Sequence, residues 1–136
     1  MINDLFDIKV VVENCNNTEE KIKTIYLAGG GAKMLMLPES YALQQNHPNP
    51  FNPTTTIKYE LPESSSISLV IYDLRGSEIF NWSNNRENAG YKRITWNGKD
   101  QNGYSIPAGV YIYKLTAKSH ESDQVFTQSR KMVLMK

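Results

Sequence analysis

The sequence has little of what catalysis, cofactor binding or membrane insertion would need. Its one cysteine, Cys15, allows no disulfide within the chain, so the fold must rest on its core. The two histidines, His47 and His120, have no recognisable nucleophile or metal-ligand cluster near them in sequence, and both are expected at the surface. No apolar run approaches the roughly 20 residues of a membrane span. We therefore expect no enzyme activity, no cofactor, no metal site and no membrane span.

An excess of charge of either sign is also missing. The 15 basic and 14 acidic residues give a net charge of +1, whereas proteins that bind nucleic acids usually carry a basic excess. Nucleic acid is therefore not an expected partner. The glycine run in "AGGGAK" (28–33) lacks the spacing and the ending of a phosphate-binding loop. The N-terminus "MINDLFDIKVVVEN" lacks the basic and apolar regions of a signal peptide, so an export signal would have to lie elsewhere.

The sequence is rich instead in short strand patterns that turn residues separate. The best helix candidate (16–31) is short and rich in β-formers, so we interpret it as a turn followed by a strand. The stretch 66–74 is apolar on both faces, which predicts a central strand. Strand patterns at intervals of about ten residues predict an all-β antiparallel sandwich. The expected strands are 7–13, 21–28, 33–37, 55–61, 66–74, 77–83, 90–98, 108–119 and 124–136.

A domain boundary is expected near residue 40. Residues 1–40 are too few to bury a core alone. We interpret them as the tail of an upstream domain, or as an extra β-hairpin docked on the sandwich. Residues 41–136 form the second unit, which is the sandwich itself.

Three prolines precede the strand at 55–61. Pro48, Pro50 and Pro53 cannot donate to a β-ladder, and each favours an extended residue before it. We therefore expect an extended lead-in without regular pairing, which Phe51 anchors on the sandwich. A rigid linker between domains is the other interpretation of the same stretch.

Two aspartates lie in predicted turns. Asp73 in "YDLRGSEI" can accept backbone N–H groups, and Gly76 can take a positive φ. The sequence "DQNG" (100–103) has the order in which a calcium loop begins, but the next regularly spaced ligand and the distant glutamate are missing. We interpret Asp100 as a side chain that bonds its own backbone in a tight turn.

Alternation assigns the large aromatic residues of the last third to the core. Tyr111, Tyr113 and Leu115 share one face of a strand, and Trp96 is expected to pack between the sheets. A tyrosine stripe that binds sugar rings is the alternative. The final stretch, 131–136, alternates apolar residues between basic ones, which is typical of an edge strand protected from aggregation by lysines.

Four pieces of the sequence, in this order, carry a family resemblance. They are "NHPNPFNPTTTIKYELPE", "ISLVIYDLRGSEI", "AGYKRITWNGKDQNGYSIPAGVYIYKL" and "SRKMVLMK". Together they resemble the C-terminal sorting domain of type IX secretion cargo, an immunoglobulin-like module of many exported bacterial proteins. The third piece is also similar to the immunoglobulin-like domain of the flagellar hook-capping protein. The resemblance covers residues 41–136.

The resemblance implies an immunoglobulin-like antiparallel β-sandwich and a non-catalytic targeting role, and the strand patterns of residues 1–40 add an N-terminal β-hairpin extension. Outer-membrane secretion and attachment machinery would recognise the domain, and an upstream passenger would pass via the periplasm to the cell surface or the medium. Because no signal peptide is present, the chain is expected to be a fragment or a gene product without its passenger. The residues implied in recognition are Pro48, Asn49, Pro50, Phe51, Asp73, Gly76, Gly109, Tyr111, Lys131, Met132, Val133, Leu134, Met135 and Lys136.

Two other functions compete with sorting. An immunoglobulin-like carbohydrate- or protein-binding module would need an exposed aromatic platform, for which Tyr91, Tyr104 and Trp82 are the candidates. A structural part of a flagellar hook scaffold would need an assembly partner and would not depend on the last strand. The proline-rich lead-in and the basic last strand argue against the scaffold.

Overall fold

The computed structural model describes residues 5–13, 20–28 and 33–136, with side chains from residue 36 onward. Its first three strands, β1 (Leu5–Glu13), β2 (Glu20–Ala28) and β3 (Lys33–Met36), form an antiparallel sheet in that order. The predicted hairpin thus has a third strand. Cys15 and the glycines at 29–31 lie outside the described residues.

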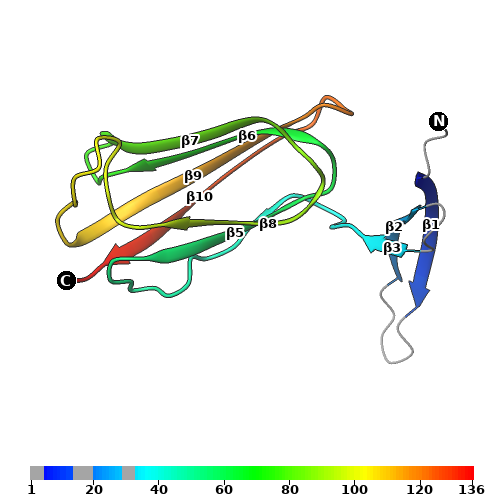
Figure 1. Ribbon diagram of the computed structural model, residues 1–136, viewed down its shortest axis with the longest axis horizontal. Coiled ribbons are helices and arrows are strands. Elements are labelled where there is room, and N and C mark those ends of the chain that lie inside the picture. Colours follow the sequence, from blue (N-terminus) through cyan, green and yellow to red (C-terminus); the bar gives the residue numbers. More distant parts are fainter. Residues whose placement is uncertain (1–4, 14–19, 29–32) are drawn as a thin grey trace.

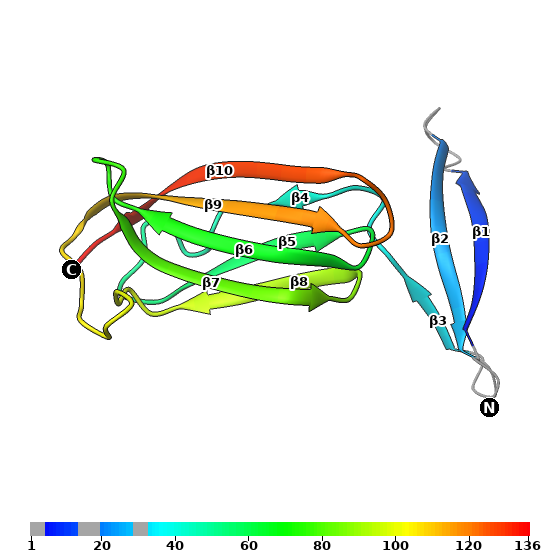
Figure 2. The ribbon, with the colours of Figure 1, turned by 90° about the horizontal axis from the view of Figure 1, so that it is seen from above.

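The rest of the chain is an antiparallel sandwich of two sheets, shown in Figures 1 and 2. The described part of the chain has no helix that could cross a membrane. The predicted all-β architecture is confirmed. One sheet has the order β10-β9-β6-β7 and the other the order β4-β5-β8. Their strands are β4 (Ala42–Leu43), β5 (Thr55–Leu61), β6 (Ser65–Tyr72), β7 (Glu78–Glu87), β8 (Gly90–Trp96), β9 (Gly109–Ser119) and β10 (Val125–Leu134).

The core follows from the alternation in the sequence. Every second residue of β5, of β6 and of β9 from Tyr111 onward is buried, because side chains of a strand point alternately to the two faces of its sheet. β6 lies inside its sheet, between β7 and β9, as its apolar pattern predicted. Trp96 is buried in the core, and so are the tyrosines expected there. The largest fully buried side chains include Phe51, Ile57, Tyr59, Leu69, Tyr113, Leu115, Met132 and Leu134.

The proline-rich lead-in differs from the expectation. Residues 47–56 do not run extended but close into a loop, because His47 and Thr56 exchange two backbone hydrogen bonds of 2.9 Å. The side chain of Asn46 fastens the loop from inside by donating to the carbonyl of Pro48 (3.1 Å) and the hydroxyl of Thr55 (3.0 Å). The prolines avoid the ladder as predicted, but the loop is part of the sandwich.

Candidate functional site

The residues predicted for recognition gather at one end of the sandwich. This distal end consists of the loop 47–56, the turn 73–77, the loop 97–109 and the end of β10 at 131–136. Both ribbon views show these segments together at the end of the sandwich where the C-terminus lies. Strands β6, β9 and β10 bring them together, since β6 ends where β9 begins and β10 ends.

The loop 47–56 is fastened along the outer edge of β10. The side-chain oxygen of Asn49 accepts from the backbone amide of Val133 at 3.0 Å. The backbone of Phe51 donates to the carbonyl of Val133 (2.9 Å) and accepts from the amide of Met135 (2.8 Å), which makes a short parallel bridge. The lead-in and the last strand, far apart in the sequence, therefore form one surface.

Phe51 anchors this loop as predicted. Its side chain is 1% exposed, and its ring lies 5.8 Å from that of Trp96, centroid to centroid. The ring of Phe80 contacts Trp96 from the other sheet at 6.1 Å. The indole N–H of Trp96 donates to the carbonyl of Lys99 (3.0 Å), so this large aromatic buries its surface and satisfies its polar atom.

Burial divides the predicted recognition residues into two groups. The exposed or half-buried ones can contact a partner: Pro48, Asn49, Pro50, Asp73, Gly76, Gly109, Lys131, Val133, Met135 and Lys136. The others are core residues and shape the distal end from inside: Phe51, Tyr111, Met132 and Leu134. The buried group cannot touch a partner while the domain is folded.

Two aspartate turns of the same form shape the distal end. Asp73 Oδ1 accepts from the amides of Arg75 and Ser77, both at 2.9 Å, and Gly76 follows with φ +88°. The turn at 100–104 repeats this pattern: the side chain of its aspartate accepts from the amides two and four residues later, and a glycine with φ +88° again stands third. The turn prediction for both aspartates is confirmed.

The second aspartate turn also covers one edge of the four-stranded sheet, at β7. The backbone amide of Gln101 donates to the carbonyl of Ile79 (3.1 Å). Its side-chain oxygen accepts from the backbone amide of Asn81 (2.8 Å). Both partners belong to β7, the outer strand of the four-stranded sheet. The turn thus occupies hydrogen-bonding groups that a bare edge would offer to another strand.

Three buried tyrosines have raised pKa values. Burial and a hydrogen bond to Glu87 (2.8 Å) raise the pKa of Tyr59 far above its ordinary value. Burial raises the pKa of Tyr111, and the negative charge of Asp73 adds to it. Burial also raises the pKa of Tyr113, although its bond from the Asn46 amide works in the opposite direction. All three hydroxyls therefore stay protonated and serve as hydrogen-bonding groups.

The two histidines are exposed, as expected. His120 lies in the turn before β10, where its Nε2 is 2.8 Å from the carbonyl of Asn85 and 3.0 Å from the hydroxyl of Ser66. Over residues 5–13, 20–28 and 33–136, no group of three or more His, Cys, Asp or Glu side chains could hold a metal ion.

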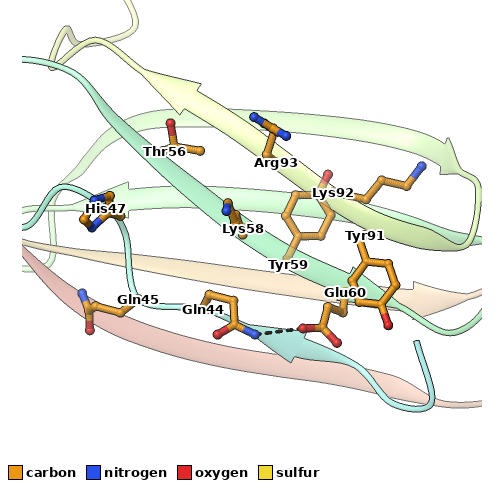
Figure 3. A pocket seen from close by; sticks show the side chains of 10 residues that line it. All are labelled: Gln44, Gln45, His47, Thr56, Lys58, Tyr59, Glu60, Tyr91, Lys92 and Arg93. Atoms are coloured by element: carbon orange, nitrogen blue, oxygen red, sulfur yellow. Dashed lines mark hydrogen bonds between the residues drawn. The ribbon is translucent and has the colours of Figure 1, made fainter. Parts of the chain in front are cut away.

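A groove lies on the outer face of the sheet β4-β5-β8 (Figure 3). It has a volume of about 700 Å³, and its lining comes from residues 44, 45, 47, 56, 58–60 and 91–93. Lys58 on β5 lies directly opposite Arg93 on β8, and Glu60 lies opposite Tyr91. The side chain of Gln44 donates to Glu60 Oε2 at 2.9 Å. We call this hollow the outer groove.

The aromatic platform proposed from the sequence is only partly present. Tyr91 is 62% exposed and borders the outer groove, and Tyr104 is 71% exposed in the second aspartate turn. Trp82 was wrong as a platform residue, because it is half-buried and packs against the core. Sequence reasoning also missed Lys58 and Arg93, since only strand register reveals that the two cations face each other.

Comparison with known proteins gives the family and the fold. The sequence model of the FlgD Ig-like domain matches residues 49–121. No curated protein matches the sequence. This match and the two antiparallel sheets confirm the immunoglobulin-like sandwich predicted from the sequence.

The solved structures to which this chain is similar are distant in sequence. Dimeric latent PorU from Porphyromonas gingivalis is 14% identical with a TM-score of 0.57, over 85% of this chain and 12% of that chain. FLGD from P. aeruginosa is 20% identical with a TM-score of 0.49, over 60% and 67%. PorZ, an essential surface component of the type-IX secretion system of Porphyromonas gingivalis, is 14% identical with a TM-score of 0.46, over 82% and 15%. This chain thus spans a small part of PorU and of PorZ.

Proposed function

Because the chain belongs to the family of FlgD Ig-like domains, we propose that it is a non-catalytic module, and specifically a sorting domain for type IX secretion. It would direct an upstream passenger via the periplasm to the cell surface or the medium. Its partners would be the secretion and attachment machinery of the outer membrane. The family membership supports the kind of module, and the distal end supports the role.

The observation that carries the proposal is the set of hydrogen bonds that joins the proline-rich lead-in to β10. Asn49 and Phe51 come from the first piece of the sorting-domain resemblance, and Val133 and Met135 from the last. A receptor that contacts this edge meets both pieces at once. Such a composite surface exists only in the folded domain, as expected if the receptor recognises the domain after it has folded.

The exposed part of the distal end has a definite chemical character. Lys131 and Lys136 are exposed cations that precede and follow Met135 along the chain, and Met135 is 53% exposed. The exposed Pro48 and Pro50 flank Asn49, which accepts from the amide of Val133 on β10. We expect the partner to offer acidic groups around an apolar contact, because charge complementarity guides association while apolar burial supplies affinity.

The test is an export assay with the full chain. A fluorescent passenger with a general export signal is fused to residues 1–136 and compared with the passenger alone, in a host that has type IX machinery. The fused passenger should reach the surface or the medium, and the passenger alone should stay in the periplasm. Retention of a fusion whose domain is folded, as judged by protease resistance, would contradict the proposal.

A truncated domain is a poor control for this assay. Removal of residues 130–136 would take Met132 and Leu134 out of the core, where each is at most 1% exposed. Loss of export would then report unfolding. Substitutions of exposed residues keep the core intact and isolate recognition.

A structural role in a flagellar hook scaffold is the second candidate, and the family match favours it. It predicts that the chain binds isolated hook structures and that exposed residues of β10 have no effect on export. Co-sedimentation with hooks, together with retention of the fused passenger, would support this candidate over sorting.

A further inference from the structure

The outer groove combines an aromatic side chain with paired cations. Tyr91 and Arg93 lie two residues apart on β8, so they point to the same face. Lys58 faces Arg93, and Glu60 faces Tyr91. Figure 3 shows these four side chains together with Gln44, which is bonded to Glu60.

The like charges on this face lower the stability of the protein without a ligand. Lys58 and Arg93 are both exposed and directly opposed across two strands. Like charges in that position repel, since Cβ atoms of opposed residues are only about 5 Å apart. Glu60 is the acidic residue of the groove, and its Oε2 is engaged by Gln44 at 2.9 Å. The two cations therefore present a place for an external anion.

The neighbouring groups indicate what kind of anion fits. Tyr91 is 62% exposed and offers an aromatic face on which an apolar ring surface can lie. The carboxylate of Glu60 and the amide of Gln44 offer acceptors and donors for hydroxyl groups. A sugar ring on Tyr91 would place hydroxyls toward this pair and a ring carboxylate toward Arg93, whose guanidinium matches a carboxylate in geometry.

We propose that the outer groove binds an acidic polysaccharide, namely a chain of sugars that carry carboxylates. Nucleic acid fits less well, because the whole chain has a net charge of only +1 and Glu60 would repel a phosphate backbone. The four residues that carry this proposal lie on β5 and β8, outside the segments of the distal end, so the proposal does not rest on the sorting role.

Calorimetric titration of the full chain with a six-sugar oligogalacturonate tests the proposal. The methyl ester of the same oligosaccharide is the neutral probe. We expect binding to the acid form, and binding to the ester that is at least about tenfold weaker, because the ester cannot form charge-assisted hydrogen bonds with the two cations. No binding to the acid form at millimolar concentration would overturn the proposal.

Variants separate a built site from a general cationic surface. K58Q/R93Q and Y91A should each weaken binding about tenfold or more, while K114Q/K118Q, which removes two exposed cations from β9, should leave binding unchanged. K58Q should also raise the midpoint of thermal unfolding without ligand, since it relieves the repulsion from Arg93. Binding of polyglutamate that equals that of the sugar acid, with no effect of Y91A, would overturn the proposal.

Discussion

The side-chain oxygen of Asn49 lies 3.0 Å from the backbone nitrogen of Val133 and accepts its hydrogen bond across 84 positions of sequence. This bond joins the proline-rich loop to the last strand. It makes the distal end a single surface, which is why we assign the sorting role to that surface.

Substitution of Asn49 by alanine should loosen the joint without unfolding the domain. The free energy of unfolding should fall by about 1 kcal/mol, the usual net value of one hydrogen bond. Hydrogen exchange should quicken at the amide of Val133, which loses its acceptor. Asn52, exposed in the same loop, provides the matched control N52A. Equal exchange at Val133 in both variants would show that the bond does not hold the strand.

Substitution of Phe51 by alanine should have a much larger effect. Its ring is buried against Trp96, so the change leaves a cavity and should cost about 3–5 kcal/mol in a urea titration. Leu74 is 64% exposed, and L74A should change stability by less than about 0.5 kcal/mol. Similar costs for the two variants would mean that Phe51 does not anchor the loop.

The loss of stability on replacing each of three glycines by alanine should depend on which atoms the added methyl group contacts. Gly76 and Gly103 both have φ +88° and no atom within 4 Å of the point that a Cβ would occupy, so G76A and G103A should each cost about 1 kcal/mol from backbone conformation alone. Gly98 also has a positive φ, and a Cβ there would lie 2.9 Å from the carbonyl oxygen of Pro53. G98A should therefore cost clearly more. Thermal unfolding of the three variants gives the ranking, and equal costs would argue against the close approach of the two loops.

Alkaline pH should destabilise the domain through its buried tyrosines. Tyr59, Tyr111 and Tyr113 have pKa values raised by burial, so the folded state holds their protons more tightly than the unfolded state. Unfolded tyrosines lose theirs near pH 10, and stability should therefore fall as the pH rises above about 10. Urea titrations at pH 8 to 11 measure the slope. In Y59F the slope should be shallower, and an unchanged slope would contradict the assignment.

Strand positions could be read from the sequence because alternation and burial have the same origin. Ile57, Tyr59 and Leu61 alternate in β5 and are all at most 1% exposed, and the predicted bounds 55–61 are those of the strand. Turn chemistry was equally readable, since Asp73 and Gly76 have side-chain and backbone properties that act within a few residues.

Contacts between distant segments could not be read in this way. Nothing local indicates that Asn49 bonds the amide of Val133, or that Asn46 closes the proline loop from inside. The outer groove escaped notice for the same reason, because Lys58 and Arg93 face each other only through the register of β5 and β8. The alternation within one strand shows on which face of the sheet a side chain lies. The pairing with the neighbouring strand determines which side chains it contacts.

The central claim is that exposed residues of the distal end are read during export. The most direct measurement is the fraction of a fused passenger that reaches the outside when Lys131 and Lys136 are replaced by glutamine, beside K114Q/K118Q, which removes two exposed cations from β9. Thermal unfolding confirms that both variants are folded. Our account predicts that export falls for K131Q/K136Q and is unchanged for K114Q/K118Q. Full export of K131Q/K136Q, or an equal loss in both variants, would contradict it.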